Sequence, residues 1–368
     1  MNIFSFLRRR KPIPEPWAKY YTKEELNIKI PDISMYDQVK KSAHLYPNYI
    51  AYEYMGKKCL YKDFIEEINE WAKVFHSSGV KHGDIVTISL PNIPNVLVVL
   101  YALNKMGAIA NMVHPLSSEE EILFSLNSTK SKYLVMLNTF YNKIENVIGK
   151  SSVDAVIFAS AADYMPIYMK LFYNLSQIGK YKKYPKNNMY YSWKKFYKKY
   201  YVTNHIKFPK FCKDTPAVII HSGGTSGTPK NVVIQNRAFI LGALQENILM
   251  KNLHAGDCCL AIMPNFHGFG LSVLMHTPLA LGCYSILIPQ FDAKKFDIMF
   301  QKKKPSCVLG VPTLYEALIS NNNVKKLDLS NLKYIVSGGD ILPKSLEDRV
   351  NKYLKEHNSP GKITQGYG

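Results

Sequence analysis

The hydrophobic residues of this chain follow two alternating patterns. In one segment they recur at spacings of three and four, which predicts an amphipathic helix closed by Gly79: Phe64, Ile65, Ile68, Trp71, Ala72 and Phe75. Short apolar runs such as DIVTISL, KYLVMLN and DAVIFAS instead predict buried strands. A further helix is expected to end near Gly107, and another to begin after Ser117 as its cap, ahead of Glu120.

The second half repeats this order with AVIIHS, CCLAIMP, SILIP, CVLGVP and YIVSGGD as strands. Alternating β and α segments at this spacing predict an α/β fold, a doubly wound and mostly parallel sheet with helices on both faces. No repeat of fixed length is present, which argues against a solenoid.

Composition narrows the class of protein. The chain has 368 residues, of which 47% are hydrophobic, so it can build at least one large core. Its six cysteines form no C-x-x-C pair and no zinc-finger spacing, so we expect reduced, buried thiols and no protein-built metal site.

Residues 1–35 contain four prolines and are expected to form a loosely packed lead-in. The start, MNIFSFLRRRKP, places its basic cluster after a short apolar run, the reverse of the order in a signal peptide, which favours a cytoplasmic location. The uncharged stretches 85–104 and 258–291 carry Pro and Asn and are interpreted as buried strands and turns, not as membrane spans.

The formal net charge is +19, so the surface should attract anions. Residues 164–213 hold twelve lysines and no acidic residue, and we interpret them as an insertion. In its first part we expect one helical face to carry Met165, Tyr168, Met169, Phe172 and Ile178. Three interpretations stay open: an insertion packed on its own domain, a helix lying on an anionic membrane, or a single-stranded nucleic-acid site. Because the charge is concentrated in one aromatic segment, we do not expect nucleic acid as a partner.

The stretch HSGGTSGTPKNVVIQN, residues 221–236, lies between two β-prone runs and cannot fill a core. Its glycines let backbone amides converge, its hydroxyls add short donors, and Lys230 adds a positive charge, as a polyphosphate requires. The pattern G-x-x-x-x-G-K-[ST] fails here because Pro229 precedes the lysine and Asn231 follows it. The dinucleotide pattern G-x-G-x-x-G fails as well.

SGGTSGTPK resembles the signature loop of the adenylate-forming enzymes, the superfamily of acyl-CoA synthetases, luciferases and the adenylation domains of peptide synthetases. Further pieces agree in the family's order: GVKHGDIVTISLPN, ALNKMGAIANMVHPLSSEEEILFSL, MPNFHGFG, VLGVPTLYEAL, VSGGDILP and TQGYG. The similarity runs from about Ser34 onward, outside the Tyr/Lys-rich segment. It implies that residues 36–368 are the large N-terminal AMP-binding domain, with sheets in two subdomains.

The resemblance also implies roles for particular residues. The loop from Ser222 to Lys230 would fold over the β- and γ-phosphates of ATP, SGGD would lie against adenine, and Tyr367 would stack on the base. His267 would line the acyl or thiol channel. The residues so implied for the nucleotide are Ser222, Gly223, Gly224, Thr225, Ser226, Gly227, Thr228, Lys230, Ser337, Gly338, Gly339, Asp340, Gly366, Tyr367 and Gly368, and the candidate catalytic residues are Lys230 and His267. Asp340 stands where the family often has a small residue.

The function implied is ATP-dependent activation of a carboxylic acid as an acyl-adenylate, followed by thioester formation with coenzyme A, with Mg²⁺ assisting. Glycines beside Leu, Met and Val in FHGFGLSVLMHTPLALG leave room for an apolar tail entering beside VPTLYEAL, which favours a fatty acid. The alternatives are an enzyme that loads a carrier-protein thiol and a non-catalytic nucleotide-binding, acyl-binding or membrane-docking module.

The sequence ends at Gly368, within the second nucleotide motif. In the family a Thr, a Mg²⁺-binding Glu, a ribose-binding Asp, a hinge and a small domain with a catalytic lysine follow this point. We therefore expect a portion of a longer enzyme that does not complete adenylation alone.

Overall fold

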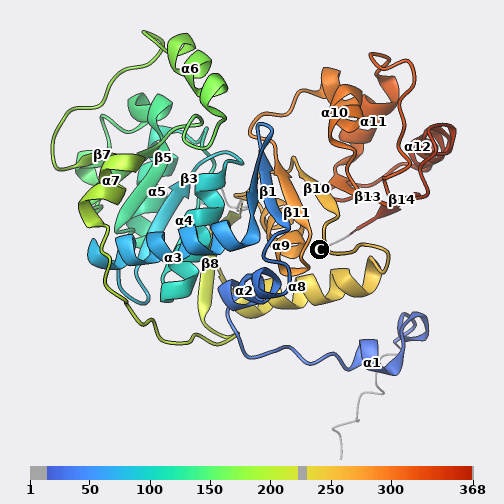
Figure 1. Cartoon of the computed structure of the whole chain (residues 1–368), viewed down its shortest axis with the longest axis horizontal. Helices are drawn as coiled ribbons and strands as arrows, with labels where there is room; N and C mark the ends of the chain where they lie inside the picture. The colour runs from blue at the N-terminus through green and yellow to red at the C-terminus, as the bar shows by residue number, and fades with distance from the viewer. Residues whose placement is uncertain (1–14, 223–229, 367–368) are drawn as a thin grey trace, which may run out of the picture.

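The computed structural model describes residues 15–222 and 230–366, which contain two seven-stranded sheets (Figure 1). One sheet, with the strand order β7-β6-β5-β3-β4-β8-β9, contains β3 (Ile85–Ser89), β4 (Ile109–Met112), β5 (Tyr133–Leu137), β6 (Ala155–Ala159), β7 (Tyr190–Ser192), β8 (Pro216–Ser222) and β9 (Lys230–Gln235). The other, with the order β14-β13-β12-β10-β11-β1-β2, contains β1 (Ile50–Tyr54), β2 (Lys57–Leu60), β10 (Cys258–Ala261), β11 (Tyr284–Leu287), β12 (Cys307–Gly310), β13 (Tyr334–Ser337) and β14 (Ile363–Gln365).

Helices join these strands and cover the sheets (Figure 1). The α-helices are α1 (Lys23–Leu26), α2 (Met35–Leu45), α3 (Tyr61–Ser77), α4 (Pro94–Met106), α5 (Glu119–Thr129), α6 (Ile167–Ser176), α7 (Trp193–Tyr200), α8 (Asn236–Leu249), α9 (Thr277–Ala280), α10 (Phe296–Lys303), α11 (Pro312–Ser320) and α12 (Lys344–Glu356). Among the other helical turns, the wide π-helical turn η5 (Phe269–His276) runs directly into α9.

Neighbouring strands run parallel in both sheets, except at the pairs β1–β2 and β8–β9. The central strands β5 and β6 are buried along their whole length, as continuous apolar runs require when helices cover both faces. The predicted doubly wound α/β fold in two subdomains is confirmed.

The largest hydrophobic cluster joins both sheets, and two further clusters lie on one sheet each. Helix α4 is buried on nearly every side, because it packs against α2 and α3 and its apolar residues occur all around the helix. Its Tyr101 hydroxyl lies 3.0 Å from Nδ1 of His276, whose Nε2 lies 3.0 Å from Oε1 of Gln38. Complete burial lowers the pKa of His276 to about 3, so this ring is a neutral part of the core.

Two buried side-chain amides join the turns that leave β3 and β10. Nδ2 of Asn92 donates to the backbone oxygens of Ala261 and Met263, each at 2.9 Å. Its Oδ1 accepts from the backbone N–H of Asn265 at 3.1 Å and from Nδ2 of Asn265 at 3.0 Å, and the same Nδ2 donates to the oxygen of Leu90 at 2.8 Å. This amide clamp, Asn92 with Asn265, fixes one sheet against the other.

Much of the segment 164–213 packs against the domain, so it is not an insertion that only protrudes from the surface. Strand β7 adds to the sheet edge beside β6, and the indole of Trp193 in α7 stacks on Trp71 at 3.7 Å between ring centroids. The five residues expected on one helical face do not share one side: Met165 is buried and Met169 packs against the core, whereas Tyr168, Phe172 and Ile178 are exposed. Periodicity alone could not tell which apolar side of this helix meets the protein.

Two smaller expectations also need correction. The cap of α5 is Ser118, whose hydroxyl accepts from the N–H of Glu121 while Glu121 accepts from the N–H of Ser118; SSEEE fits a capping box in two registers. Of the six free cysteines, Cys212 is exposed and Cys59 is half-buried. Within residues 15–222 and 230–366, no helix combines the length and apolar character that crossing a bilayer requires.

We predict that Asn92→Ala destabilises the protein by about 2–3 kcal/mol, because four hydrogen bonds are lost and two buried carbonyl oxygens lose a donor. Urea unfolding measures this change, with the exposed Asn188→Ala as the matched control. Equal unfolding midpoints for the two variants would show that the hydrogen bonds of Asn92 do not stabilise the fold.

Glu246 of α8 provides a pH test. Burial raises the pKa of its carboxyl to about 8, although the Thr277 hydroxyl nearby partly offsets the effect. Between pH 4.5 and 8 the folded state keeps a proton that the unfolded state has released, so the free energy of unfolding falls as the pH rises through this window.

Glu246→Gln should remove this dependence and stabilise the protein at pH 8 by on the order of 3 kcal/mol relative to wild type, with little gain at pH 5. Thermal unfolding across this range, with exposed Glu66→Gln as the control, measures the difference. A gain independent of pH would show that Glu246 does not titrate in the window.

Candidate functional site

Strands β8 and β9 hold the two ends of the glycine-rich loop. Ser222 and Lys230 are cross-strand partners in this antiparallel pair, and both are exposed. Because β8 runs parallel to β4, Ser222 lies at the carboxyl edge of its sheet, where open α/β sheets bind ligands. The predicted residues within the loop lie outside the described residues: Gly223, Gly224, Thr225, Ser226, Gly227 and Thr228.

His221, directly before the loop, is held by a buried polar network. Its Nε2 lies 2.7 Å from Oδ1 of Asn111 and 3.1 Å from Oγ of Ser125. Burial lowers the pKa of His221, and the neighbouring Asn231 side chain partly offsets this effect. The neutral ring therefore places its proton on Nε2, since the amide oxygen of Asn111 can only accept.

Asn111 of β4 is fully buried and extends this network beneath the sheet. Its Nδ2 donates to Oγ1 of Thr87 at 2.8 Å and to Oγ of Ser125 at 2.9 Å. The hydroxyls of Thr87 and Ser131 are 2.6 Å apart. A nearly satisfied network in a low-dielectric interior is rigid, so it fixes the strand end from which the loop departs.

The predicted adenine-side loop follows β13. The Ser337 backbone lies at the strand end, its buried side chain has no hydrogen-bond partner among the described residues, and the N–H of Gly338 donates to Gly310 O at 2.8 Å. Gly339 has a φ of +75°, a backbone conformation that residues other than glycine rarely adopt. The side chain of Asp340 is exposed, and its Oδ1 accepts from the N–H of Ile341 at 2.7 Å.

The segment after β14 meets the same loop. The N–H of Gly366 donates to Ser337 O at 2.8 Å, and Gly366 O lies 3.3 Å from where a side chain on Gly338 would begin. Three of the predicted nucleotide contacts, Ser337, Gly338 and Gly366, are therefore neighbours in space. Tyr367 and Gly368 lie outside the described residues.

His267 lies on the turn between β10 and η5, which the amide clamp anchors. Its side chain is exposed, and its Nδ1 accepts from the N–H of Phe269 at 3.2 Å. Gly270 permits this turn, because a Cβ atom there would lie 2.1 Å from Pro264 O. The turn thus leaves His267 exposed, with its Nδ1 already bonded to the backbone.

This turn also connects the two halves of the candidate site. The side chain of Ile220, two residues before Ser222, lies 3.9 Å from the position of a Cβ on Gly268. The ring of Phe269 lies 3.4 Å from that of a Cβ on Gly338. The strand end before the glycine-rich loop, the His267 turn and the SGGD loop are therefore neighbours in space, and together we call them the candidate surface.

Sequence reasoning overlooked the residues that position this surface. Asn92 and Asn265 lie in two of the motifs that resemble the family, but nothing in their spacing predicts that their side-chain amides form hydrogen bonds with each other. The sequence could have flagged His221 as a polar residue inside the apolar run AVIIHS. In the described ranges, no three His, Cys, Asp or Glu side chains gather to hold a metal ion.

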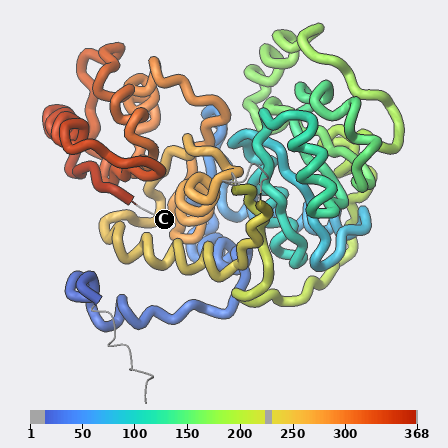
Figure 2. The backbone as a smooth tube through the Cα atoms, turned by 180° about the vertical axis from the view of Figure 1, so that it is seen from behind, coloured from blue at the N-terminus to red at the C-terminus, as the bar shows by residue number. Residues whose placement is uncertain are grey.

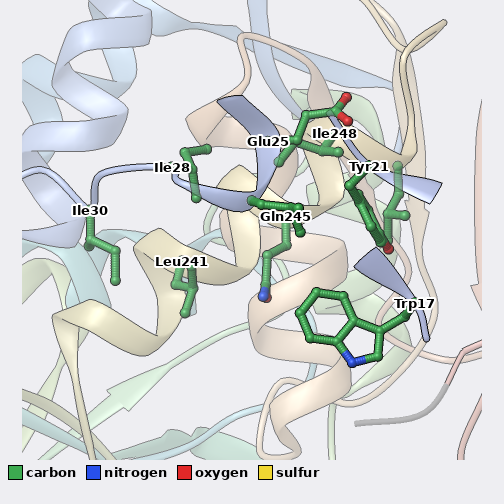
Figure 3. Close-up of a pocket in the computed structure, with 10 residues that line it drawn as sticks. Trp17, Tyr21, Glu25, Ile28, Ile30, Leu241, Gln245 and Ile248 are labelled. Carbon is green, nitrogen blue, oxygen red and sulfur yellow. The ribbon is translucent and has the colours of Figure 1, made fainter. Parts of the chain in front are cut away.

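A separate cavity of about 610 Å³ lies between the lead-in and α8 (Figure 3). Trp17, Tyr21, Ile28 and Ile30 contribute one wall, and Leu241 and Ile248 contribute the other. In Figure 2 the lead-in runs alongside α8. None of the predicted site residues lines this cavity, so it is distinct from the candidate nucleotide surface.

The chain is similar in sequence to CoA ligases. It is 27% identical over 361 residues to a long-chain-fatty-acid–CoA ligase of Bacillus subtilis, covering 96% of this chain and 63% of that protein. It is 25% identical over 325 residues to 4-coumarate–CoA ligase 4 of Arabidopsis thaliana, covering 85% of this chain and 51% of that protein. The chain thus spans less than two thirds of the length of either relative.

The fold is also that of solved CoA ligases. A long-chain-fatty-acid-CoA ligase from Archaeoglobus fulgidus superimposes with a TM-score of 0.75 at 19% identity, covering 93% of this chain and 65% of that one. An anthranilate CoA ligase in complex with anthranoyl-AMP superimposes with a TM-score of 0.77 at 19% identity, covering 94% of this chain and 61% of that one.

The model of one family, described as AMP-binding enzyme, matches residues 39–368, which include both sheets and every element of the candidate site. The expected resemblance to adenylate-forming enzymes is confirmed, and the chain belongs to the AMP-binding enzyme family.

Proposed function

We propose that the protein containing this chain activates a carboxylic acid with ATP and transfers the acyl group to coenzyme A. The family match supports this proposal, as do the CoA ligases among the relatives. The observation that carries it is that the end of β8, the His267 turn and the SGGD loop, which make up the candidate surface, are neighbours in space. That surface lies at the carboxyl end of parallel strands, where a nucleotide is expected.

The reaction takes place in two steps. A carboxylate oxygen attacks the α-phosphorus of ATP, an acyl–O–phosphorus bond forms, and pyrophosphate leaves. The thiolate of coenzyme A then attacks the acyl carbonyl carbon, and AMP leaves with its bonding electron pair. Both steps bring anions together, so the protein must supply positive charge and N–H donors.

In this proposal each part of the site has one task. Lys230 and the loop from Ser222 contact the β- and γ-phosphates, while the backbone at Ser337–Asp340 and the segment 366–368 contact the adenine. The exposed His267 lines the channel by which the acid or thiol approaches. Lys230 is well placed to reach a ligand because its side chain leaves the first residue of β9.

Mg²⁺ enters the proposal as a complex with the triphosphate. The described residues gather no carboxylate cluster that could hold the ion by themselves. Mg²⁺ in phosphoryl sites commonly uses substrate phosphates with one or two carboxylates, so triphosphate oxygens would supply ligands here. Bound in this way, Mg²⁺ would offset negative charge on the phosphates.

A fatty acid is the proposed substrate, supported by the long-chain-fatty-acid–CoA ligase of Bacillus subtilis. An aromatic acid is the second candidate substrate, supported by the 4-coumarate–CoA ligase of Arabidopsis thaliana. A carrier-protein thiol is the alternative acceptor, and a non-catalytic nucleotide-binding or acyl-binding module is the alternative to an enzyme.

We predict that Lys230→Ala weakens ATP binding about tenfold or more and leaves AMP binding unchanged, because the ammonium would contact only the phosphates that AMP lacks. Calorimetry with ATP and with AMP measures both affinities. Lys302→Ala, an exposed lysine of α10, is the matched control. An equal loss for ATP and AMP would place Lys230 elsewhere than on the terminal phosphates.

His221→Phe should weaken ATP binding and destabilise the protein by about 1–3 kcal/mol, because the buried oxygen of Asn111 loses its donor. His221→Gln retains an N–H donor and should behave more like wild type. Unfolding midpoints and ATP affinity test both variants. If the two variants proved equally impaired, ring shape and not hydrogen bonding would be the function of His221.

A further inference from the structure

Helix α6 presents an apolar face that the rest of the described residues leave uncovered. The face consists of six exposed side chains, each at least 61% accessible: Ile167, Tyr168, Leu171, Phe172, Leu175 and Ile178. At 100° per residue the five members within α6 fall on one continuous side of the helix, and Ile178 follows just beyond its end. Exposed apolar patches of this kind mark interaction sites.

The opposite side of α6 is already occupied. Met169 and Tyr173 pack against the core, and Met165 just before the helix is buried. The Tyr164 hydroxyl donates to Glu67 of α3, and Asp163 accepts from the N–H of Ser160 at 2.7 Å. The helix is therefore attached firmly at its start, and its exposed face is a fixed feature of the surface.

The position of α6 favours contact with an extended surface. Figures 1 and 2 both show the helix at the outer margin of its half of the molecule, projecting beyond the sheet. None of the predicted nucleotide-site residues lies on it. An extended surface could cover this face without closing the candidate site.

The positive charge on α6 and in the loop that follows it favours one kind of partner. Lys170 lies on α6, and four more exposed lysines follow in the next loop, namely Lys180, Lys182, Lys183 and Lys186. Of these, Lys182 pairs with Glu145. Residues 164–213 contribute twelve lysines and no acidic residue to a net charge of +19. A second copy of this chain would bring the same positive charge to the contact and be repelled.

We propose that α6 is a membrane-docking helix, which inserts its apolar face between the headgroups of an anionic bilayer while the flanking lysines contact lipid phosphates. An interfacial amphipathic helix with a lysine-rich border has this arrangement. Tyr168 suits such an interface, because its ring is apolar and its hydroxyl can stay in contact with water. This inference is independent of the proposed reaction.

Vesicle sedimentation tests the proposal with vesicles of phosphatidylcholine alone and of phosphatidylcholine with phosphatidylglycerol. We expect binding to the anionic vesicles, weaker binding to the neutral ones, and a loss of binding as salt screens the lysines. The double variant Leu171→Glu with Phe172→Glu should bind at least tenfold more weakly. Both positions are exposed, so folding is unaffected.

Leu45→Glu with Leu116→Glu, two similarly exposed residues away from α6, is the matched control and should bind as wild type does. In a second measurement, Phe172→Trp should shift its fluorescence to the blue when anionic vesicles are added, because the indole leaves water. Equal binding by the two double variants, or no shift, would overturn the proposal. Vesicle-free dimerisation that Leu171→Glu with Phe172→Glu abolishes would also overturn it, in favour of a second copy.

Discussion

Two sheets can contribute to one ligand surface only if the turns that follow their strands are held in a fixed position relative to each other. The amides of Asn92 and Asn265 do this, because each donates to backbone oxygen of the other turn and the two side chains also bond to each other. The turn with His267 then bridges from Ile220 on one sheet to Gly338 on the other. The candidate site is in this sense a consequence of how the sheets are joined.

A second buried network supports the glycine-rich loop from below. Asn111 connects the hydroxyls beneath the sheet to His221, and burial keeps that ring neutral so that it can donate from Nε2. The network fixes the end of β8 at Ser222, from which the glycine-rich segment continues.

We propose two roles for the positive charge of the chain, one in contacting the nucleotide and one in contacting a membrane. One lysine, Lys230, begins β9 beside the candidate nucleotide site, whereas Lys170 lies on α6 and four more lysines follow it in the next loop. A lysine-rich border discourages association between copies and favours an anionic surface. None of the predicted nucleotide-site residues lies on α6.

The sequence by itself determined the strand and helix order, the α/β class and the family, because hydrophobic period and ordered motifs depend on neighbours along the chain. It also found the segments that carry the candidate site. Only the tertiary structure decided that Asn92 meets Asn265, that Asn111 holds His221, and that Met165 and Met169 face inward while Leu171 and Phe172 face outward. These outcomes depend on contacts between residues far apart in the sequence. Periodicity predicts which side of a helix is apolar, but not what packs against that side.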